Sequence, residues 1–127
     1  MKITLKNLAK ATAQQVFDQV AAHLLKQGVR SAKNIDGEPY CSYRAIKHGL
    51  TLKCAAGCLI AKSEYKADFE DVTWGGLVKR GLVPGNNDEL ITDLQKIHDN
   101  VDIESWRYEL KGLAKDHKLN LSVLETV

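Results

Sequence analysis

Apolar and polar positions follow a helical period in several stretches of the chain, and the clearest stretch begins at Thr12. Thr12 and Gln15 have the spacing of a capping box, in which the threonine oxygen accepts a backbone N–H and the glutamine side chain returns to the cap. Apolar residues then recur at helical spacing, at Val16, Phe17, Val20, Ala21, Leu24 and Leu25. Gly28 suits the left-handed residue that ends a helix. The pattern predicts a helix over residues 12–27.

Three further helices are predicted in the second half of the chain. Thr73 is expected to cap a short helix that Gly81 ends. Asn87 is expected to cap a third helix, with Asp88 favourably placed at the positive end of its dipole. Asp102 is expected to open the last long helix. The apolar stripes of these helices comprise Trp74, Leu77, Val78, Leu90, Ile91, Leu94, Ile97, Ile103, Trp106, Leu110, Leu113 and Ala114.

The middle of the chain has a weaker pattern. Residues 29–39 are polar and predicted to be irregular, with a turn over residues 36–39. Residues 40–44 alternate aromatic and small side chains, which indicates a short strand. After the break at Gly49, residues 50–52 are predicted to pair back as the second strand of a small hairpin. Such an isolated unit needs a helix to pack against.

Residues 54–61 are apolar and rich in small side chains, which favours a short buried helix over a strand. Gly57 is costly inside a helix, so it suggests a close contact that a side chain would block. Together the elements predict a mainly α fold, with an α+β class left open. We expect one compact domain over residues 1–127, with about four helices and a small β-hairpin.

Composition sets the class of protein but not its activity. The 127 residues are 44% hydrophobic and 27% charged, which is typical of a globular domain and excludes a disordered chain. No apolar run is long enough to span a bilayer, and the N-terminus lacks the apolar region of a secretory signal. We therefore expect an intracellular protein with no membrane partner. Three cysteines are too few for a disulfide framework, which fits a reducing compartment.

The net charge of +2 conceals two halves of opposite sign. Residues 1–67 contain 11 Lys/Arg and 4 Asp/Glu, whereas residues 68–127 contain 7 Lys/Arg and 12 Asp/Glu. A basic half is typical of proteins that bind nucleic acid or nucleotides. Because the basic residues form no run of five or more, we favour the interpretation that the two halves attract each other on folding.

The cysteines are the most specific feature of the sequence. If residues 54–60 are helical, Cys54 and Cys58 lie one turn apart on one face. They could then share a Zn²⁺ ion with Cys41 as the third ligand and His98 or His48 as the fourth. The favoured interpretation is that all three thiols are buried packing groups, because free cysteine is among the most buried residue types. A redox or nucleophilic role stays open.

No catalytic constellation can be recognised in the sequence. A Cys–His pair needs a histidine within hydrogen-bond reach of the thiol, and each of the four histidines is more typical of a helix surface or core. Asp99 follows His98 directly, but adjacent helical residues point about 100° apart, so adjacency alone does not orient the ring. No spaced acid pair, phosphate loop or nucleophile elbow is present. Trp74 and Trp106 are expected to be structural core residues.

Aromatic and cationic residues between positions 40 and 53 form the best candidate for a binding surface. Aromatic rings can stack on a base, and cations can neutralise phosphate. The competing interpretation is that Arg44 covers a helix flank and pairs with an acidic residue. The candidate ligand-binding residues are Tyr43, Arg44, Lys47, His48 and Lys53.

One set of motifs resembles a known family. Cys41-x-Tyr43-Arg44 is followed by Cys54-Ala55-x-Gly57-Cys58-Leu59-Ile60 and then by Tyr65. With the segments QQVFDQVAAHLLKQG, LQKIHDN and SWRYELKGLA, these residues are similar to a family of small uncharacterised proteins encoded mainly by tailed bacteriophages and prophages. The resemblance covers roughly residues 14–114. It implies a phage accessory product that acts in the bacterial cytoplasm, and it carries over no catalytic residues.

These observations favour a non-enzymatic binding protein. We expect its partner to be a host protein or a small anionic ligand near Tyr43, Arg44 and Lys53. The alternatives are a zinc-stabilised structural module, a nucleic-acid-binding protein and a cysteine-dependent enzyme. The sequence identifies neither the partner nor the oligomeric state.

Overall fold

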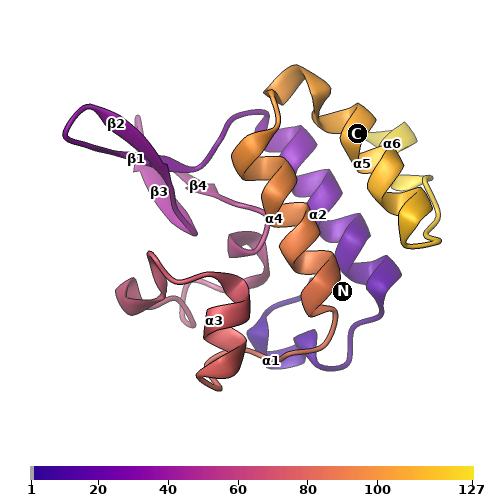
Figure 1. Cartoon of the computed structure of the whole chain (residues 1–127), viewed down its shortest axis with the longest axis horizontal. Coiled ribbons are helices and arrows are strands. Elements are labelled where there is room, and N and C mark those ends of the chain that lie inside the picture. Colours follow the sequence, from indigo (N-terminus) through magenta and orange to yellow (C-terminus); the bar gives the residue numbers. More distant parts are fainter. Residues whose placement is uncertain (1) are drawn as a thin grey trace.

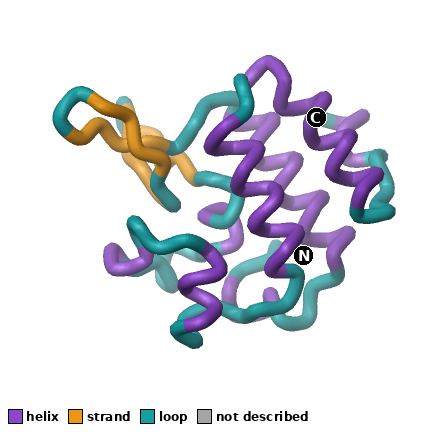
Figure 2. Tube along the Cα trace, viewed as in Figure 1, coloured by secondary structure: helices purple, strands orange, loops and turns teal. Residues whose placement is uncertain are grey.

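A computed structural model describes residues 2–127, in which helices form the body and two β-hairpins project from it (Figures 1 and 2). The α-helices are α1 (Leu5–Leu8), α2 (Ala13–Gln27), α3 (Trp74–Lys79), α4 (Asp88–Asn100), α5 (Trp106–Asp116) and α6 (Val123–Thr126). The strands are β1 (Ala32–Ile35), β2 (Glu38–Cys41), β3 (Arg44–Lys47) and β4 (Leu50–Lys53). Short 3₁₀ turns occupy Gly57–Leu59, Ala67–Phe69 and Ile103–Ser105. The prediction of an α-rich fold with a hairpin component is confirmed, but six helices and two hairpins replace about four helices and one hairpin.

Helix α2 forms as predicted and lies at the centre of the body. The Thr12 hydroxyl accepts from the Gln15 N–H, and the Gln15 side chain accepts from the Thr12 N–H. Gly28 ends the helix with φ of +66°, a conformation that costs glycine nothing. The apolar stripe of α2 packs against α4 and α5. Ile3 and Leu124, near the two ends of the chain, are both buried in this core.

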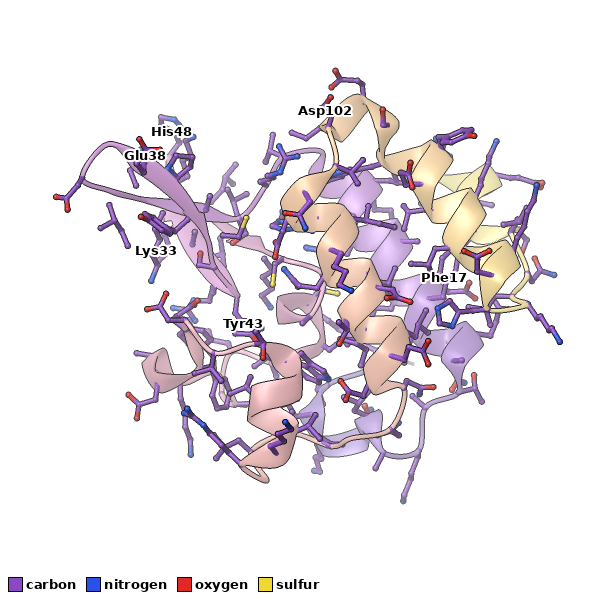
Figure 3. The ribbon with its side chains drawn as sticks, viewed as in Figure 1. Phe17, Lys33, Glu38, Tyr43, His48 and Asp102 are labelled. Atoms are coloured by element: carbon purple, nitrogen blue, oxygen red, sulfur yellow. The ribbon has the colours of Figure 1, made fainter. Side chains whose placement is uncertain are left out.

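The predicted hairpin over residues 40–52 is wrong, because two hairpins form instead. β1 pairs with β2 around Asp36-Gly37, and β3 pairs with β4 around His48-Gly49. All four loop residues have positive φ, as two-residue type I′ hairpin loops require. Figure 3 shows Lys33, Glu38 and His48 on these hairpins, whereas Phe17 lies among the helices.

The segment 54–61 is buried as expected, but it forms a turn and a short 3₁₀ helix in place of a longer helix. The expected close contact at Gly57 is confirmed. A Cβ added to Gly57 would lie 2.0 Å from the carbonyl oxygen of Tyr43. The segment therefore lies directly against the chain that joins the two hairpins.

The two predicted caps after residue 72 differ in outcome. Thr73 caps α3 by accepting from the Gly76 N–H, as expected. Asn87 precedes α4 as expected but does not cap it, because its side chain donates to the Ala11 carbonyl oxygen instead. Asn87 has φ of +59°, which asparagine tolerates better than most residues.

Candidate functional site

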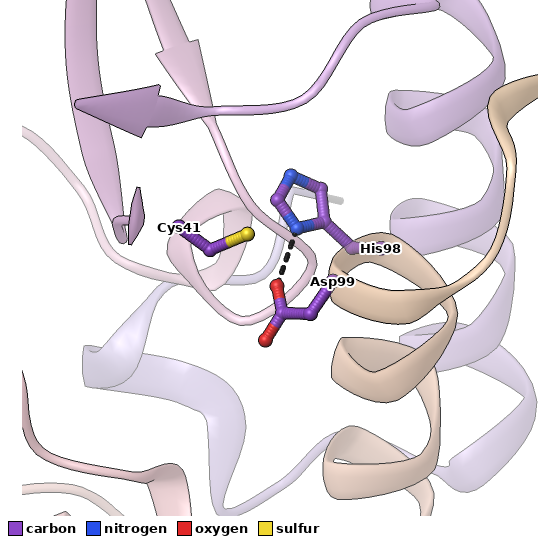
Figure 4. A group of neighbouring side chains, drawn as sticks. All are labelled: Cys41, His98 and Asp99. Carbon is purple, nitrogen blue, oxygen red and sulfur yellow. Dashed lines mark hydrogen bonds and ion pairs between the residues drawn. The ribbon is translucent and has the colours of Figure 1, made fainter. Parts of the chain in front are cut away.

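Cys41, His98 and Asp99 come together where the first hairpin meets the end of α4. Their ligand atoms lie within 4.8 Å of one another. Figure 4 shows the Cys41 thiol at the end of β2 facing the two side chains from α4. His98 is fully buried, whereas Cys41 is exposed as a residue.

The hydrogen bonds of His98 fix the position of its proton. The Ser31 backbone N–H donates to Nε2 of His98 at 3.0 Å, so Nε2 is the unprotonated nitrogen. Nδ1 therefore carries the hydrogen and donates to Oδ1 of Asp99 at 2.7 Å. Asp99 also accepts from the side-chain amide of Gln95 at 2.7 Å. Asp99 therefore does orient the His98 ring, through this hydrogen bond and the contact from Ser31, which adjacency in sequence alone could not show.

The environment of Cys41 keeps its thiol protonated. Burial of the thiol raises its pKa to about 11, and the charge of Asp99 and a hydrogen bond to Asp99 act in the same direction. Neither nitrogen of His98 is free to accept the thiol proton, since one accepts from Ser31 and the other donates to Asp99. A nucleophilic cysteine needs the thiolate form, and this arrangement opposes it.

The same geometry bears on the predicted zinc site. Cys54 and Cys58 are not part of the Cys41–His98–Asp99 cluster among residues 2–127. The Cys54 sulfur accepts from the Gly57 N–H at 3.3 Å, and the Cys58 thiol donates to the Ala55 carbonyl at 3.1 Å.

A metal on Nδ1 of His98 would move the ring proton to Nε2, where it would face the Ser31 N–H. A metal-binding histidine normally donates a hydrogen bond from the nitrogen that does not bind the metal. Here that nitrogen is Nε2, which accepts from the Ser31 N–H and so disfavours zinc. Zinc binding by Cys41, Cys54, Cys58 and His98 stays a prediction, although within residues 2–127 the group close enough to share a metal is Cys41, His98 and Asp99.

The prediction of buried cysteines is confirmed for two of the three. Cys54 and Cys58 are buried, and burial raises the pKa of both thiols, that of Cys58 to about 12. Cys41 is the exception, because it ends an exposed strand. Gly57 and Trp106, the other predicted structural residues, are buried in the core.

A cleft of about 510 Å³ opens beside Cys41 and Asp99. Its walls come from the chain between the hairpins, the segment before α3, and one face of α4. Charged side chains on the walls are Glu70, Asp71, Asp88, Lys96 and Asp99. The cleft is therefore acidic, with four carboxylates and one ammonium group.

The five predicted ligand-binding residues do not form one surface. Tyr43 is buried, and its hydroxyl donates to the Val72 carbonyl at 2.5 Å. The Arg44 guanidinium lies 4.7 Å from the centre of the Tyr65 ring. Lys47 and His48 are exposed at the tip of the second hairpin. Lys53 lies at the base of that hairpin, against α2.

Lys53 belongs to a second depression, which we call the basic groove. It has a volume of about 700 Å³ between α2, the N-terminal segment and the end of β4. Its charged and titratable side chains are Lys2, Asp18, His23, Lys26 and Lys53, apart from the Cys58 thiol. Three ammonium groups and an imidazole thus face a single carboxylate.

The positive charges of the basic groove repel one another. Burial lowers the pKa of His23, and the charges of Lys53 and Lys2 lower it further, whereas a hydrogen bond to the Lys53 carbonyl raises it. Burial also lowers the pKa of Lys53, with Lys2 contributing. Nε2 of His23 lies 2.9 Å from the Lys53 carbonyl, which only accepts, so Nε2 carries the ring hydrogen and Nδ1 is unprotonated.

Sequence reasoning missed most of the basic groove. His23 and Lys26 are three residues apart on α2 and share a face, so the sequence alone could have placed these two side chains together. Lys2 and Lys53 reach the same place only through the tertiary fold. No local pattern connects them.

The cleft and the basic groove lie on either side of the buried segment 54–58. Cys54 lines the cleft and Cys58 lines the basic groove, and the two depressions share no lining residue.

No helix among residues 2–127 combines the length and the apolar character needed to cross a bilayer. No protein-family model, curated protein or solved structure matches this chain.

Proposed function

We propose that this chain is a non-enzymatic binding protein and that the basic groove binds an anionic group. One observation carries the proposal: Lys2, Lys26, Lys53 and His23 surround one depression that contains a single carboxylate, Asp18. An anion placed there relieves the repulsion among these side chains.

The chemistry of the basic groove suits a phosphate or carboxylate. Lysine ammonium groups are strong donors to anionic oxygens. His23 adds a fourth donor residue, because an anion favours the protonated ring and Nδ1 then donates. A volume of about 700 Å³ is in the range of small-molecule sites. A small phosphate-bearing molecule therefore fits the basic groove in both size and charge.

The absence of catalysis is part of the proposal. It is supported by the protonated thiol of Cys41 and by the occupied nitrogens of His98. The cysteine-enzyme alternative makes a different prediction, which is selective alkylation of one folded-state thiol at neutral pH.

The biological setting is also proposed. The resemblance described for the sequence supports a bacteriophage or prophage accessory product acting in the host cytoplasm. A host protein that presents an anionic group to the basic groove, a free anionic ligand and a nucleic acid are the candidate partners. A titration series of small anions and an oligonucleotide separates the free ligand from the nucleic acid.

Calorimetric titration with inorganic phosphate, pyrophosphate, ATP and a short single-stranded oligonucleotide tests the proposal. We expect at least one of these anions to bind, and Lys26→Gln and Lys53→Gln each to weaken it roughly tenfold. Lys33→Gln and Lys47→Gln remove the same charge from the hairpins and serve as matched controls, with changes below about twofold.

Two results would refute the proposal. One is the absence of binding by every probe at millimolar concentration, and the other is an equal loss of affinity in the hairpin controls. Binding of the oligonucleotide with an affinity that falls steeply with salt, and of no small anion, would favour the nucleic-acid alternative.

A further inference from the structure

The acidic cleft contains charges and a donor that the folded chain leaves unsatisfied. Its four carboxylates fall into two pairs with different surroundings. Glu70 accepts from the Tyr43 N–H at 2.9 Å and from the Tyr65 hydroxyl at 2.6 Å. Asp99 accepts from His98 and Gln95. These two carboxylates are therefore occupied within the fold.

Asp71 and Asp88, the other two carboxylates of the cleft, are not occupied in this way by donors of the fold. No ion pair within residues 2–127 involves either carboxylate. Asp88 has a long contact of 3.4 Å with the Thr92 hydroxyl, and Asp71 is exposed. Lys96, the cationic residue of the cleft, lies on the same helix as Asp88 but forms no ion pair with it. The free charge of the cleft is negative.

Trp74 provides an independent observation in the same wall. The residue lines the cleft and is 3% exposed. Its indole nitrogen is covered and has no hydrogen-bond acceptor among residues 2–127. A buried N–H without an acceptor destabilises the fold, so an acceptor that enters this wall is bound favourably. By contrast, the Trp106 N–H donates to the Val101 carbonyl at 3.0 Å.

We propose that this cleft binds a basic side chain of a partner polypeptide, with its cation at Asp71 and Asp88 and its neighbouring amide carbonyl accepting from Trp74. A cation alone satisfies the carboxylates but leaves the indole unpaired. An arginine or lysine residue within a polypeptide carries both groups a few bonds apart. Because the indole nitrogen is covered, a lining side chain moves aside as the carbonyl enters.

This inference is independent of the proposed function, since it uses the other depression and the opposite charge. Its test uses the two indole N–H signals in a ¹H–¹⁵N correlation spectrum of the full chain. The probe is Nα-acetyl-arginine methylamide, which is a single blocked arginine residue. We expect the Trp74 signal to move downfield during the titration as its hydrogen bond forms, whereas the Trp106 signal stays in place.

Variants and ligand analogues separate the parts of the proposal. Asp71→Asn and Asp88→Asn should each weaken the apparent affinity about fivefold. Asp116→Asn, an exposed carboxylate on α5, should leave it unchanged. An unmoved Trp106 signal in each variant shows that the fold is intact.

Three outcomes would overturn the inference. The first is an immobile Trp74 signal at about 10 mM probe. The second is an equal response to the citrulline analogue, which has the same shape without the charge. The third is an equal response to agmatine, which has the guanidinium without the amide, because the partner polypeptide would then be unnecessary.

Discussion

The contact between Gly57 and Tyr43 leads to a quantitative prediction for Gly57→Ala. A new Cβ would lie 2.0 Å from the Tyr43 carbonyl oxygen and 2.9 Å from its carbon. Both atoms are backbone, so no side chain can rotate to make room, and one of the two segments must shift by about 1 Å. The φ of Gly57 is outside the left-handed region, so the effect is purely steric.

The expected cost of Gly57→Ala follows from two opposing effects. Forcing a methyl group into a packed core typically costs about 1–3 kcal/mol, and a rigid backbone neighbour places this site at or above the upper end. Alanine also lowers the conformational entropy of the unfolded chain, which stabilises the folded state by about 0.4–1 kcal/mol. We expect a net loss of about 2 kcal/mol or more in the free energy of unfolding.

Urea denaturation followed by tryptophan fluorescence measures this loss. With a slope of about 1–3 kcal/mol per molar urea, the midpoint should fall by roughly 1 M. Gly112→Ala is the matched control, because Gly112 lies within α5 with open space around its Cβ position. That change should raise the midpoint, since alanine favours the helix by up to about 1 kcal/mol. A loss below about 0.5 kcal/mol in Gly57→Ala would refute the steric argument.

Three other predictions concern the titratable groups. The raised pKa of Cys41, about 11, predicts slow alkylation of its thiol by iodoacetamide at pH 8. Asp99→Asn should speed the alkylation several-fold, because it removes a charge that disfavours the thiolate. An unchanged alkylation rate, measured by mass spectrometry, would contradict this. The lowered pKa of His23 predicts stability that is complete above about pH 6.5 and falls on acidification, because the unfolded chain then binds a proton that the folded chain does not. His23→Gln should flatten this slope in urea midpoints between pH 7.5 and 5.5, and an equally steep variant would argue against it. If the bond from Ser31 to His98 opposes metal binding, elemental analysis after metal-free purification should give less than about 0.2 Zn per chain, whereas one equivalent would support the zinc alternative.

Local chemistry made some elements predictable from the sequence. Helix α2 has a capping box, an apolar stripe and a C-terminal glycine within one stretch of chain, so the prediction needed no distant contact. The first hairpin was missed although Asp36-Gly37 is a strong turn signal. β2 is exposed along its whole length and β1 is nearly so, and the alternation of buried and exposed residues on which strand prediction depends is therefore missing.

The sites depended more on distant contacts than the helices did. His98 and Asp99 act together because Ser31 and Cys41 approach the last turn of α4 from another part of the chain. Adjacency along the helix could not show this. Among the predicted ligand-binding residues, Lys53 lies in the basic groove with partners more than 20 residues away. The charge asymmetry of the sequence was visible, but its arrangement into one basic and one acidic depression was not.

The attachment of the first hairpin has a practical consequence. Ser31 lies just before β1 and its N–H donates to His98. Cys41 ends β2 and is hydrogen-bonded to Asp99. The two ends of this hairpin are therefore held by the same His98–Asp99 pair. The loop at Asp36-Gly37 lies beyond that point, exposed and apart from the core. An epitope tag or fluorophore inserted there should report on the chain while leaving the helical body and both depressions undisturbed.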